Sequence, residues 1–195
     1  MTDNALVVID VQESFRARPL WATTSNPDVI KNVGRLVDAA RAAGDRVIWV
    51  VHAEPGTGNT FDPVHGHVRV VGELTPAEDE PLLVKTVHNA FTTTNLQHLL
   101  TVAGIRSITV AGLRTEQCVE TTARFASDLG YRVTFAIDAT ATNPIPHPDA
   151  PADQTVDELL ADPRTLSAED VVARTVYALS GRFATVRTVS EILGE

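Results

Sequence analysis

Short runs of β-branched and other apolar residues alternate along the chain with stretches in which apolar residues recur every three or four positions. The runs have the length of buried strands, and the recurring spacing is typical of amphipathic helices. The predicted strands cover residues 5–10, 46–52, 82–85, 107–112, 131–139 and 183–186. The predicted helices cover residues 28–44, 93–104, 118–130, 168–179 and 188–193.

Strands that alternate with helices form parallel sheets, because each helix carries the chain back to the start of the next strand. The sequence therefore predicts an α/β fold: a single doubly wound domain over residues 1–195, with helices on both faces of a parallel sheet. Residues 53–81 and the proline-rich residues 140–166 keep no regular period and are predicted to be irregular. The prolines of 140–166 suit an ordered segment, either a lid over a pocket or a contact with a neighbouring subunit.

The composition is that of an ordinary globular protein, and its charge narrows the choice of partners. Hydrophobic residues make up 44% of the 195 residues, charged residues make up 21%, and the formal net charge is -9. We expect neither a nucleic-acid partner nor an anionic membrane partner, because both require clustered Lys and Arg. The first apolar run is only as long as a strand and follows no basic leader, so neither a signal peptide nor a membrane span is expected.

Three residues that can carry chemistry come at the ends of predicted strands. Asp10 ends the first strand, Lys85 ends the third, and Cys118 follows the fourth at the start of a helix. Because the carboxyl ends of parallel strands meet at one edge of the sheet, we expect these three side chains to lie close together. Cys118 is the only cysteine, which excludes an internal disulfide and a cysteine zinc site and favours a reducing, cytoplasmic location.

A carboxylate, an ammonium and a thiol at one edge would form a nucleophilic site. A neighbouring cation and a helix N-terminus both favour the thiolate, so we expect the pKa of Cys118 to lie below the usual value of about 8.5. Asp10 can then accept the thiol proton and return it to a leaving amine. The alternatives for Cys118 are a buried core residue and a redox thiol, although no second cysteine is available to resolve a sulfenic acid. Read alone, Asp10 fits a capping residue and Lys85 a solvated strand end.

Four blocks, far apart but in a constant order, resemble those of the isochorismatase-like cysteine hydrolases, a group that includes nicotinamidases and N-carbamoylsarcosine amidases. The blocks are VVIDVQESF at 7–15, VKTVHNAF at 84–91, VAGLRTEQCVETTARFASDLGY at 110–131 and FAIDATAT at 135–142. The resemblance covers residues 5 to about 142. It implies a six-stranded parallel sheet of order 3-2-1-4-5-6, in which the first and fourth strands are neighbours.

The resemblance also implies a role for each residue of this centre. Asp10 matches the general base of the family, Lys85 its triad lysine and Cys118 its nucleophile. It further implies a cis peptide bond between Leu113 and Arg114, and an oxyanion hole formed by the backbone N–H groups of Arg114 and Cys118.

A nucleophilic cysteine implies hydrolysis of a C–N bond in a small amide, carbamoyl or ureido substrate through a thioester acyl-enzyme. No organic cofactor is then required, and the resemblance implies homodimers or homotetramers. One alternative is isochorismatase-type hydrolysis of a non-amide metabolite, although the true isochorismatases lack the cysteine. Two others are a non-catalytic relative that binds a small molecule and a Rossmann-type nucleotide-binding protein, whose glycine-rich fingerprint is missing after the first and fourth strands.

Other residues are assigned to the surroundings of the site. The resemblance implies substrate contacts from Gln12, Phe15, Phe91 and Leu113, although Phe15 fits a core residue equally well. Thr115 and Glu116 are expected to cap the helix that begins near Cys118. Arg16, Arg18 and Arg114 are candidates for binding a substrate carboxylate, a role that surface arginines usually do not have.

A metal site is not expected. Nicotinamidases bind a metal through a D-x-H motif after the second strand, and the matching segment VVHAEPG has His52 without the aspartate. His65, His67 and the nearby Asp62 offer ligand atoms, but imidazole and carboxylate groups alone do not establish a ligand geometry.

Overall fold

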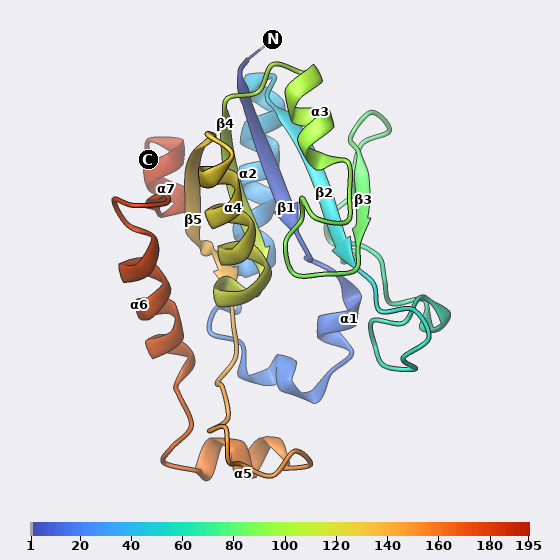
Figure 1. The fold of residues 1–195 in the computed structure, drawn as a ribbon, viewed down its shortest axis with the longest axis vertical. Helices are drawn as coiled ribbons and strands as arrows, with labels where there is room; N and C mark the ends of the chain where they lie inside the picture. Colours follow the sequence, from blue (N-terminus) through green and yellow to red (C-terminus); the bar gives the residue numbers. More distant parts are fainter. Residues whose placement is uncertain (1) are drawn as a thin grey trace.

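The structure is a computed structural model that describes residues 2–195. Its centre is a sheet of six parallel strands in the order β3-β2-β1-β4-β5-β6 (Figure 1), which confirms the order implied by the resemblance. The strands are β1 (Asn4–Ile9), β2 (Arg46–His52), β3 (Leu82–Lys85), β4 (Ser107–Leu113), β5 (Arg132–Ala141) and β6 (Thr185–Arg187). The strand order reverses between β1 and β4, and the loops that leave these strands therefore diverge at the point where such folds bind ligands.

Helices cover both faces of the sheet, as the sequence predicts (Figure 1). Apolar side chains of α3, α4 and α6 pack on one face, and those of α2 and α7 pack on the other. The helices are α1 (Glu13–Arg16), α2 (Val29–Ala43), α3 (Leu96–Val102), α4 (Glu120–Asp128), α5 (Val156–Ala161), α6 (Ala168–Leu179) and α7 (Val189–Leu193). Among residues 2–195, no helix combines the length and the apolar character that a membrane crossing requires.

The central strand is buried on both sides because its residues alternate between two cores. Val7 and Ile9 of β1 belong to the core beneath α3 and α4, whereas Leu6 and Val8 belong to the core beneath α2. Complete burial of such a side chain contributes about 1.5–3 kcal/mol. These contacts fix the end of β1 and therefore the position of Asp10, the residue that follows it.

Element boundaries differ from the sequence prediction where apolar runs meet loops. α3 begins at Leu96 rather than at residue 93, and the Leu96 N–H donates a hydrogen bond to Thr94 Oγ1 (3.1 Å). This local hydrogen bond competes with the first turn of the helix, so α3 begins later than predicted. β5 continues two residues beyond the predicted strand, and β6 begins two residues later than predicted.

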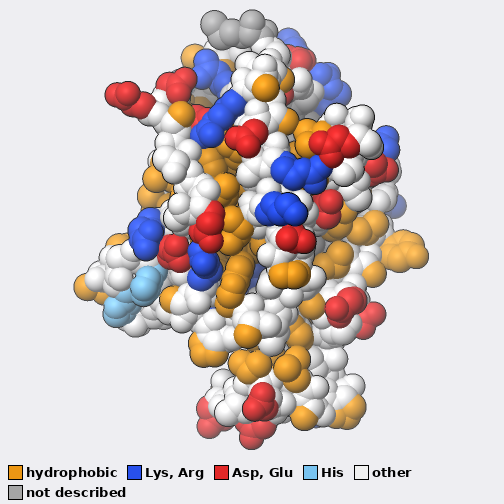
Figure 2. Space-filling view, turned by 180° about the vertical axis from the view of Figure 1, so that it is seen from behind, with side chains coloured by type: hydrophobic (Ala, Val, Ile, Leu, Met, Phe, Trp, Pro, Cys, Tyr) orange, Lys and Arg blue, Asp and Glu red, His pale blue; other side chains and the backbone are white. Residues whose placement is uncertain are grey.

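The proline-rich segment 140–166 forms an arm that projects from the body of the protein (Figure 1). An antiparallel bridge between Ile145 and Leu166 closes its base. The arm contains α5, which the sequence analysis missed although Thr155 and Glu158 form the capping box that such a spacing indicates. In Figure 2 the arm is a separate lobe, with hydrophobic side chains near its junction with the body and acidic side chains at its tip.

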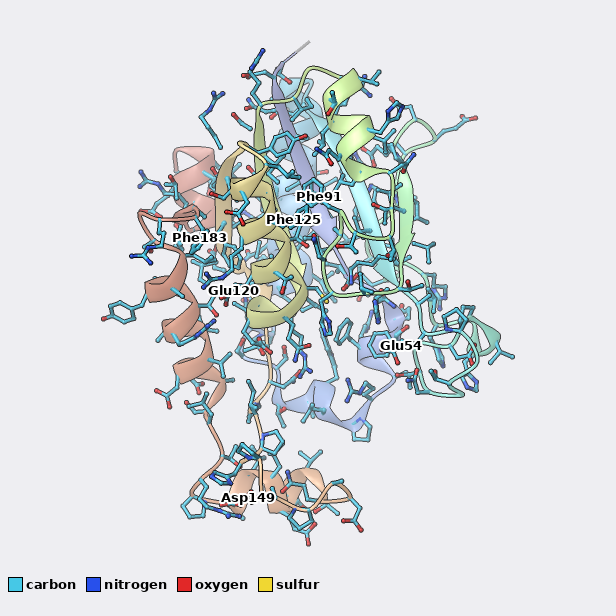
Figure 3. All side chains as sticks on the ribbon, in the orientation of Figure 1. Glu54, Phe91, Glu120, Phe125, Asp149 and Phe183 are labelled. Carbon is cyan, nitrogen blue, oxygen red and sulfur yellow. The ribbon has the colours of Figure 1, made fainter. Side chains whose placement is uncertain are left out.

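Glu120, in the first turn of α4, joins this helix to α6 (Figure 3). Its nearly buried carboxylate accepts hydrogen bonds from Arg124 Nε (2.9 Å), Arg174 Nη1 (2.6 and 2.7 Å) and Thr175 Oγ1 (2.9 Å). Because α4 follows directly on the segment that carries Cys118, this network also fixes the position of the thiol.

Replacing Glu120 with glutamine is expected to lower the free energy of unfolding by about 2 kcal/mol, because the charge-assisted bonds are lost while a polar group stays buried. Urea unfolding measures the loss. Glu78→Gln is the matched control, since Glu78 is exposed and has no ion pair within the described residues. Equal midpoints for the two variants would contradict the role given to Glu120.

Candidate active site

Asp10, Lys85 and Cys118 meet at the carboxyl edge of the sheet, as the strand order requires. The Lys85 Nζ lies 2.7 Å from Asp10 Oδ2 and donates a hydrogen bond to Cys118 Sγ (3.3 Å). The Asp10 N–H donates to the Val50 carbonyl of β2 (2.8 Å), which continues the pairing of the sheet. The left-handed backbone of Asp10 (φ 56°) then turns the chain away from the sheet. Asp10 and Lys85 are fully buried, and Cys118 is 5% exposed.

The third contact of Lys85 is a histidine that the sequence analysis considered only as a metal ligand. The Nζ of Lys85 lies 3.4 Å from His52 Nδ1, and His52 Nε2 lies 3.0 Å from Glu54 Oε1. Because an ammonium can only donate, Nδ1 accepts, and the ring proton is assigned to Nε2, which donates to Glu54. Asn59 Nδ2 donates to the other Glu54 oxygen (2.6 Å). Lys85 Nζ thus lies within 3.4 Å of three groups: the Asp10 carboxylate, the Cys118 sulfur and the His52 imidazole.

The sequence contained a signal for this arrangement. His52 ends β2 and pairs in register with Lys85 of β3, so both side chains leave the sheet at the same level. Glu54 follows two residues later, where a carboxylate can reach the distal nitrogen of the imidazole.

The electrostatics of the thiol are opposite to the expectation from sequence. Burial raises the pKa of Cys118 to about 12, and the negative charge of Asp10 adds to this effect, while Lys85 opposes it. Burial also raises the pKa of Asp10 above its usual value of 3.8, and Lys85 again opposes the shift. The prediction of a lowered pKa for Cys118 was wrong because it counted the cation and the helix N-terminus but not the removal of water.

The raised pKa of Cys118 favours a protonated thiol at rest. Such a thiol beside an ammonium–carboxylate pair has no net charge, and a neutral group of side chains is the one that a buried site holds at least cost. Lys85 contacts both Asp10 and the sulfur, so a proton can pass from the thiol to the carboxylate while the negative charge stays beside the same ammonium.

The segment between β4 and α4 presents Cys118. The peptide bond between Leu113 and Arg114 is cis, and residues Thr115–Val119 form one π-helical turn that continues into α4. The expected capping by Thr115 and Glu116 does not occur. The Thr115 hydroxyl donates instead to Thr140 Oγ1 (2.9 Å), and the carboxylate oxygens of Glu116 are buried without a hydrogen-bond partner in the described structure.

Gln12 occupies a different place from the predicted substrate contact. Its amide nitrogen donates to Ser14 Oγ and to the His52 carbonyl (both 2.9 Å), and its amide oxygen accepts from the His52 N–H (2.6 Å). These bonds use both amide hydrogens, so Gln12 joins the end of β1 to the end of β2. Phe15 packs edge-to-face on Phe61 (4.9 Å between ring centres), which in turn contacts His52.

Phe91 and Leu113, also predicted to contact substrate, have their side chains in the two cores. Figure 3 shows Phe91 beside Phe125 of α4, with 5.7 Å between the ring centres, and its ring stacks at 6.1 Å on Tyr131 near the opposite edge of the sheet. The Leu113 side chain packs in the core beneath α2, so this residue reaches the site only through its peptide bond. Apolar residues next to a motif were assigned to the pocket because the sequence does not tell which face they occupy.

A cavity of about 810 Å³ lies beside the buried centre. The turn before α4 contributes Arg114 and Gln117 to its wall, and the segment after α1 contributes residues 17–20. The arm closes the other side with residues between 144 and 159. Gln117 directly precedes Cys118 in the chain, whereas Asp10, Lys85 and Cys118 themselves do not line the cavity.

Two of the histidines named as metal-ligand candidates have partners within the protein. His52 is engaged with Lys85 and Glu54, and His65 Nε2 lies 3.0 Å from the Gly58 carbonyl oxygen. Within residues 2–195, no group of three or more His, Cys, Asp and Glu side chains is arranged to hold a metal ion.

Replacing His52 with alanine is expected to lower the kcat/KM of the reaction at this site about 10-fold, because Lys85 loses the acceptor that fixes its direction. His52→Asn should restore much of the rate, since an amide oxygen can accept from Lys85 at the place of Nδ1. His88→Ala is the control, because His88 is exposed and stacks on the His52 ring without lying between His52 and Lys85 or Glu54. Equal losses in the alanine and asparagine variants would contradict the positioning role.

Comparison with known proteins agrees with this architecture. The chain is 35% identical over 144 residues to a streptothricin hydrolase of Streptomyces noursei, covering 73% of this chain and 56% of the relative. It is 28% identical over 173 residues to the ureidoacrylate amidohydrolase RutB of Agrobacterium fabrum, covering 71% and 76%. The crystal structure of a cysteine hydrolase from Pseudomonas syringae pv. phaseolicola superposes with a TM-score of 0.82 at 25% identity, covering 100% of this chain and 93% of that one.

The fold and these relatives define the class: the protein is a hydrolase built on a six-stranded, doubly wound sheet. The family model described as the isochorismatase domain matches residues 4–175. The chain therefore belongs to the isochorismatase family.

Proposed function

We propose that this hydrolase cleaves the C–N bond of a small amide, carbamoyl or ureido compound, with Cys118 as the nucleophile. The observation that carries the proposal is the position of Lys85 Nζ, 2.7 Å from Asp10 Oδ2 and 3.3 Å from Cys118 Sγ. A thiol with a raised pKa needs a base at the moment of attack, and Asp10 is the carboxylate that shares its cation.

The first half of the reaction forms the acyl-enzyme. Asp10 takes the thiol proton as the sulfur attacks the carbonyl carbon, and the carbonyl oxygen becomes negative. The backbone N–H groups of Arg114 and Cys118 stabilise that oxygen, a contribution of about 3 kcal/mol for each fixed donor. The C–N bond breaks as protonated Asp10 donates to the nitrogen, which leaves as ammonia or an amine.

The second half releases the acid. Asp10, again ionised, takes a proton from a water molecule that attacks the thioester, and the sulfur recovers the proton as the carboxylic acid departs. Every proton is returned, so neither half requires an organic cofactor. The amidohydrolase among the relatives supports a C–N bond as the target, and the cysteine at position 118 supports covalent catalysis.

An ammonia-release screen over small primary amides and carbamoyl compounds tests the proposal. At least one compound should release ammonia, with kcat/KM falling as the pH drops through the pKa of Asp10. Because burial raises that pKa, the acid limb should lie above pH 3.8, the usual value for aspartic acid, and activity should be present above it. A flat profile down to pH 3.8 would contradict Asp10 as the base.

A further inference from the structure

Two guanidinium groups line the cavity beside the site. Arg18 enters it from the segment after α1, and Arg114 enters it from the turn that presents Cys118. The one carboxylate on the cavity wall is that of Asp157, an exposed residue of the arm. The cavity wall, which includes the residue before Cys118, therefore carries two arginines and one carboxylate in a protein whose formal net charge is -9.

Arg18 and Arg114 form no ion pair within the described residues, whereas Arg16, the third candidate for binding a carboxylate, does. Arg16 pairs with Glu73 at 2.7 Å, and that pair is solvent-exposed and outside the cavity. Within the described residues, no carboxylate lies within 4.0 Å of Arg18 or Arg114.

The immediate surroundings of the two guanidiniums leave their N–H edges available. The Cζ atom of Arg18 lies over the ring of Phe61, 6.0 Å from its centre, a cation–π contact that requires no hydrogen-bond acceptor. The Nε of Arg114 is buried without a hydrogen-bond partner. Burial lowers the pKa of Arg114, Glu116 opposes that effect, and the charge of Arg18 lowers the pKa further, which indicates that the two cations are near each other.

We propose that Arg18 and Arg114 bind an anionic group of the substrate, so that the substrate is an amide or ureide that also carries a carboxylate. This inference rests on the proposed function. Two like charges in one cavity repel each other, and a bound carboxylate relieves that repulsion while accepting bidentate hydrogen bonds.

The position of Arg114 gives the arrangement its specificity. Its backbone N–H belongs to the oxyanion hole of the proposed mechanism, and its side chain lines the cavity, so one residue contacts both the reacting carbonyl and the anion. A substrate with a cationic group would meet two guanidiniums that form no ion pair within the described residues, and is disfavoured. Glu54 and Glu116 act electrostatically on Arg18 and Arg114, and Asp157 lies on the cavity wall, but none of these carboxylates is within ion-pair distance of either arginine.

Calorimetric titration of the full chain carrying Cys118→Ser tests the inference without turnover. The probes are succinamate and glutaramate, each compared with its neutral diamide. Each acid is expected to bind about 10-fold more tightly than its diamide. Adding Arg18→Gln should remove most of that difference. Arg16→Gln is the matched control and should keep the full preference, because Arg16 is already paired.

Equal affinities for acid and diamide, an Arg18→Gln result that matches Arg16→Gln, or no binding of either acid would each overturn the inference. Ammonia release by the unmodified chain separates it from the proposed function. Hydrolysis of neutral amides without charge preference would leave the nucleophile in place and remove the anion site. Selective binding of the acids without any hydrolysis would support the anion site and contradict the proposed reaction.

Discussion

Replacing Cys118 with alanine is expected to lower kcat/KM for ammonia release by at least about 1000-fold, because the variant lacks the sulfur that forms the proposed acyl-enzyme. Cys118→Ser is the matched variant for volume. We expect a comparable loss, since a hydroxyl is a far poorer nucleophile than a thiol at neutral pH. Ammonia release with the best compound of the screen measures both.

The loss must be separated from a loss of folding, because Cys118 belongs to a hydrophobic core. Thermal unfolding should show that both variants stay folded at the assay temperature, and the serine variant should still bind the compound that the native protein hydrolyses. An alanine variant with more than about a tenth of the native rate would be incompatible with a covalent mechanism at this residue.

Replacing Gly112 with alanine is expected to abolish folding at physiological temperature, with a loss above about 4 kcal/mol. Gly112 has a φ of 123°, and an added Cβ would lie 1.8 Å from the Ile9 carbonyl oxygen. That oxygen is backbone of the neighbouring β1, so the contact is relieved only if the two central strands separate. Chemical denaturation and circular dichroism of the purified variant measure the effect.

Gly56→Ala isolates the contribution of the clash. Gly56 also has a positive φ (78°), but nothing lies within 4 Å of an added Cβ. Its substitution should cost only the backbone preference, about 1–2 kcal/mol. If the Gly112 variant folds with the stability of the Gly56 variant, the close approach of β1 and β4 is not as tight as described.

The fold was predictable because the hydrophobic pattern of the strands differs clearly from that of the helices. Continuous apolar runs such as ALVVI have residues for both faces of a sheet, and the helical spacing of the 28–44 segment has residues for one face of a helix. The start of α3 and the presence of α5 were missed. They depend on local hydrogen bonds of Thr94 and on the capping box of Thr155 and Glu158, which do not change a hydrophobic pattern.

The centre of the site was predictable because strand ends in a parallel sheet share an edge. Ile9 of β1 pairs with Gly112 of β4, and His52 of β2 pairs with Lys85 of β3. Asp10, which follows Ile9, and Lys85 therefore lie at the same edge of the sheet as the segment that leaves β4. The pKa of Cys118 and the positions of Phe91 and Gln12 were not predictable. Each depends on how much water and which neighbours surround a side chain, and these follow from packing between distant segments.

Partitioning of the intermediate tests the central claim most directly. The native protein is allowed to hydrolyse its best amide in the presence of increasing hydroxylamine, and the products are quantified by mass spectrometry. A thioester on Cys118 predicts that hydroxamate replaces carboxylic acid in proportion to hydroxylamine, while one ammonia is released for each acyl group transferred. Undiminished ammonia release with carboxylic acid as the sole product at every hydroxylamine concentration would show that water attacks the amide directly, and would contradict the account.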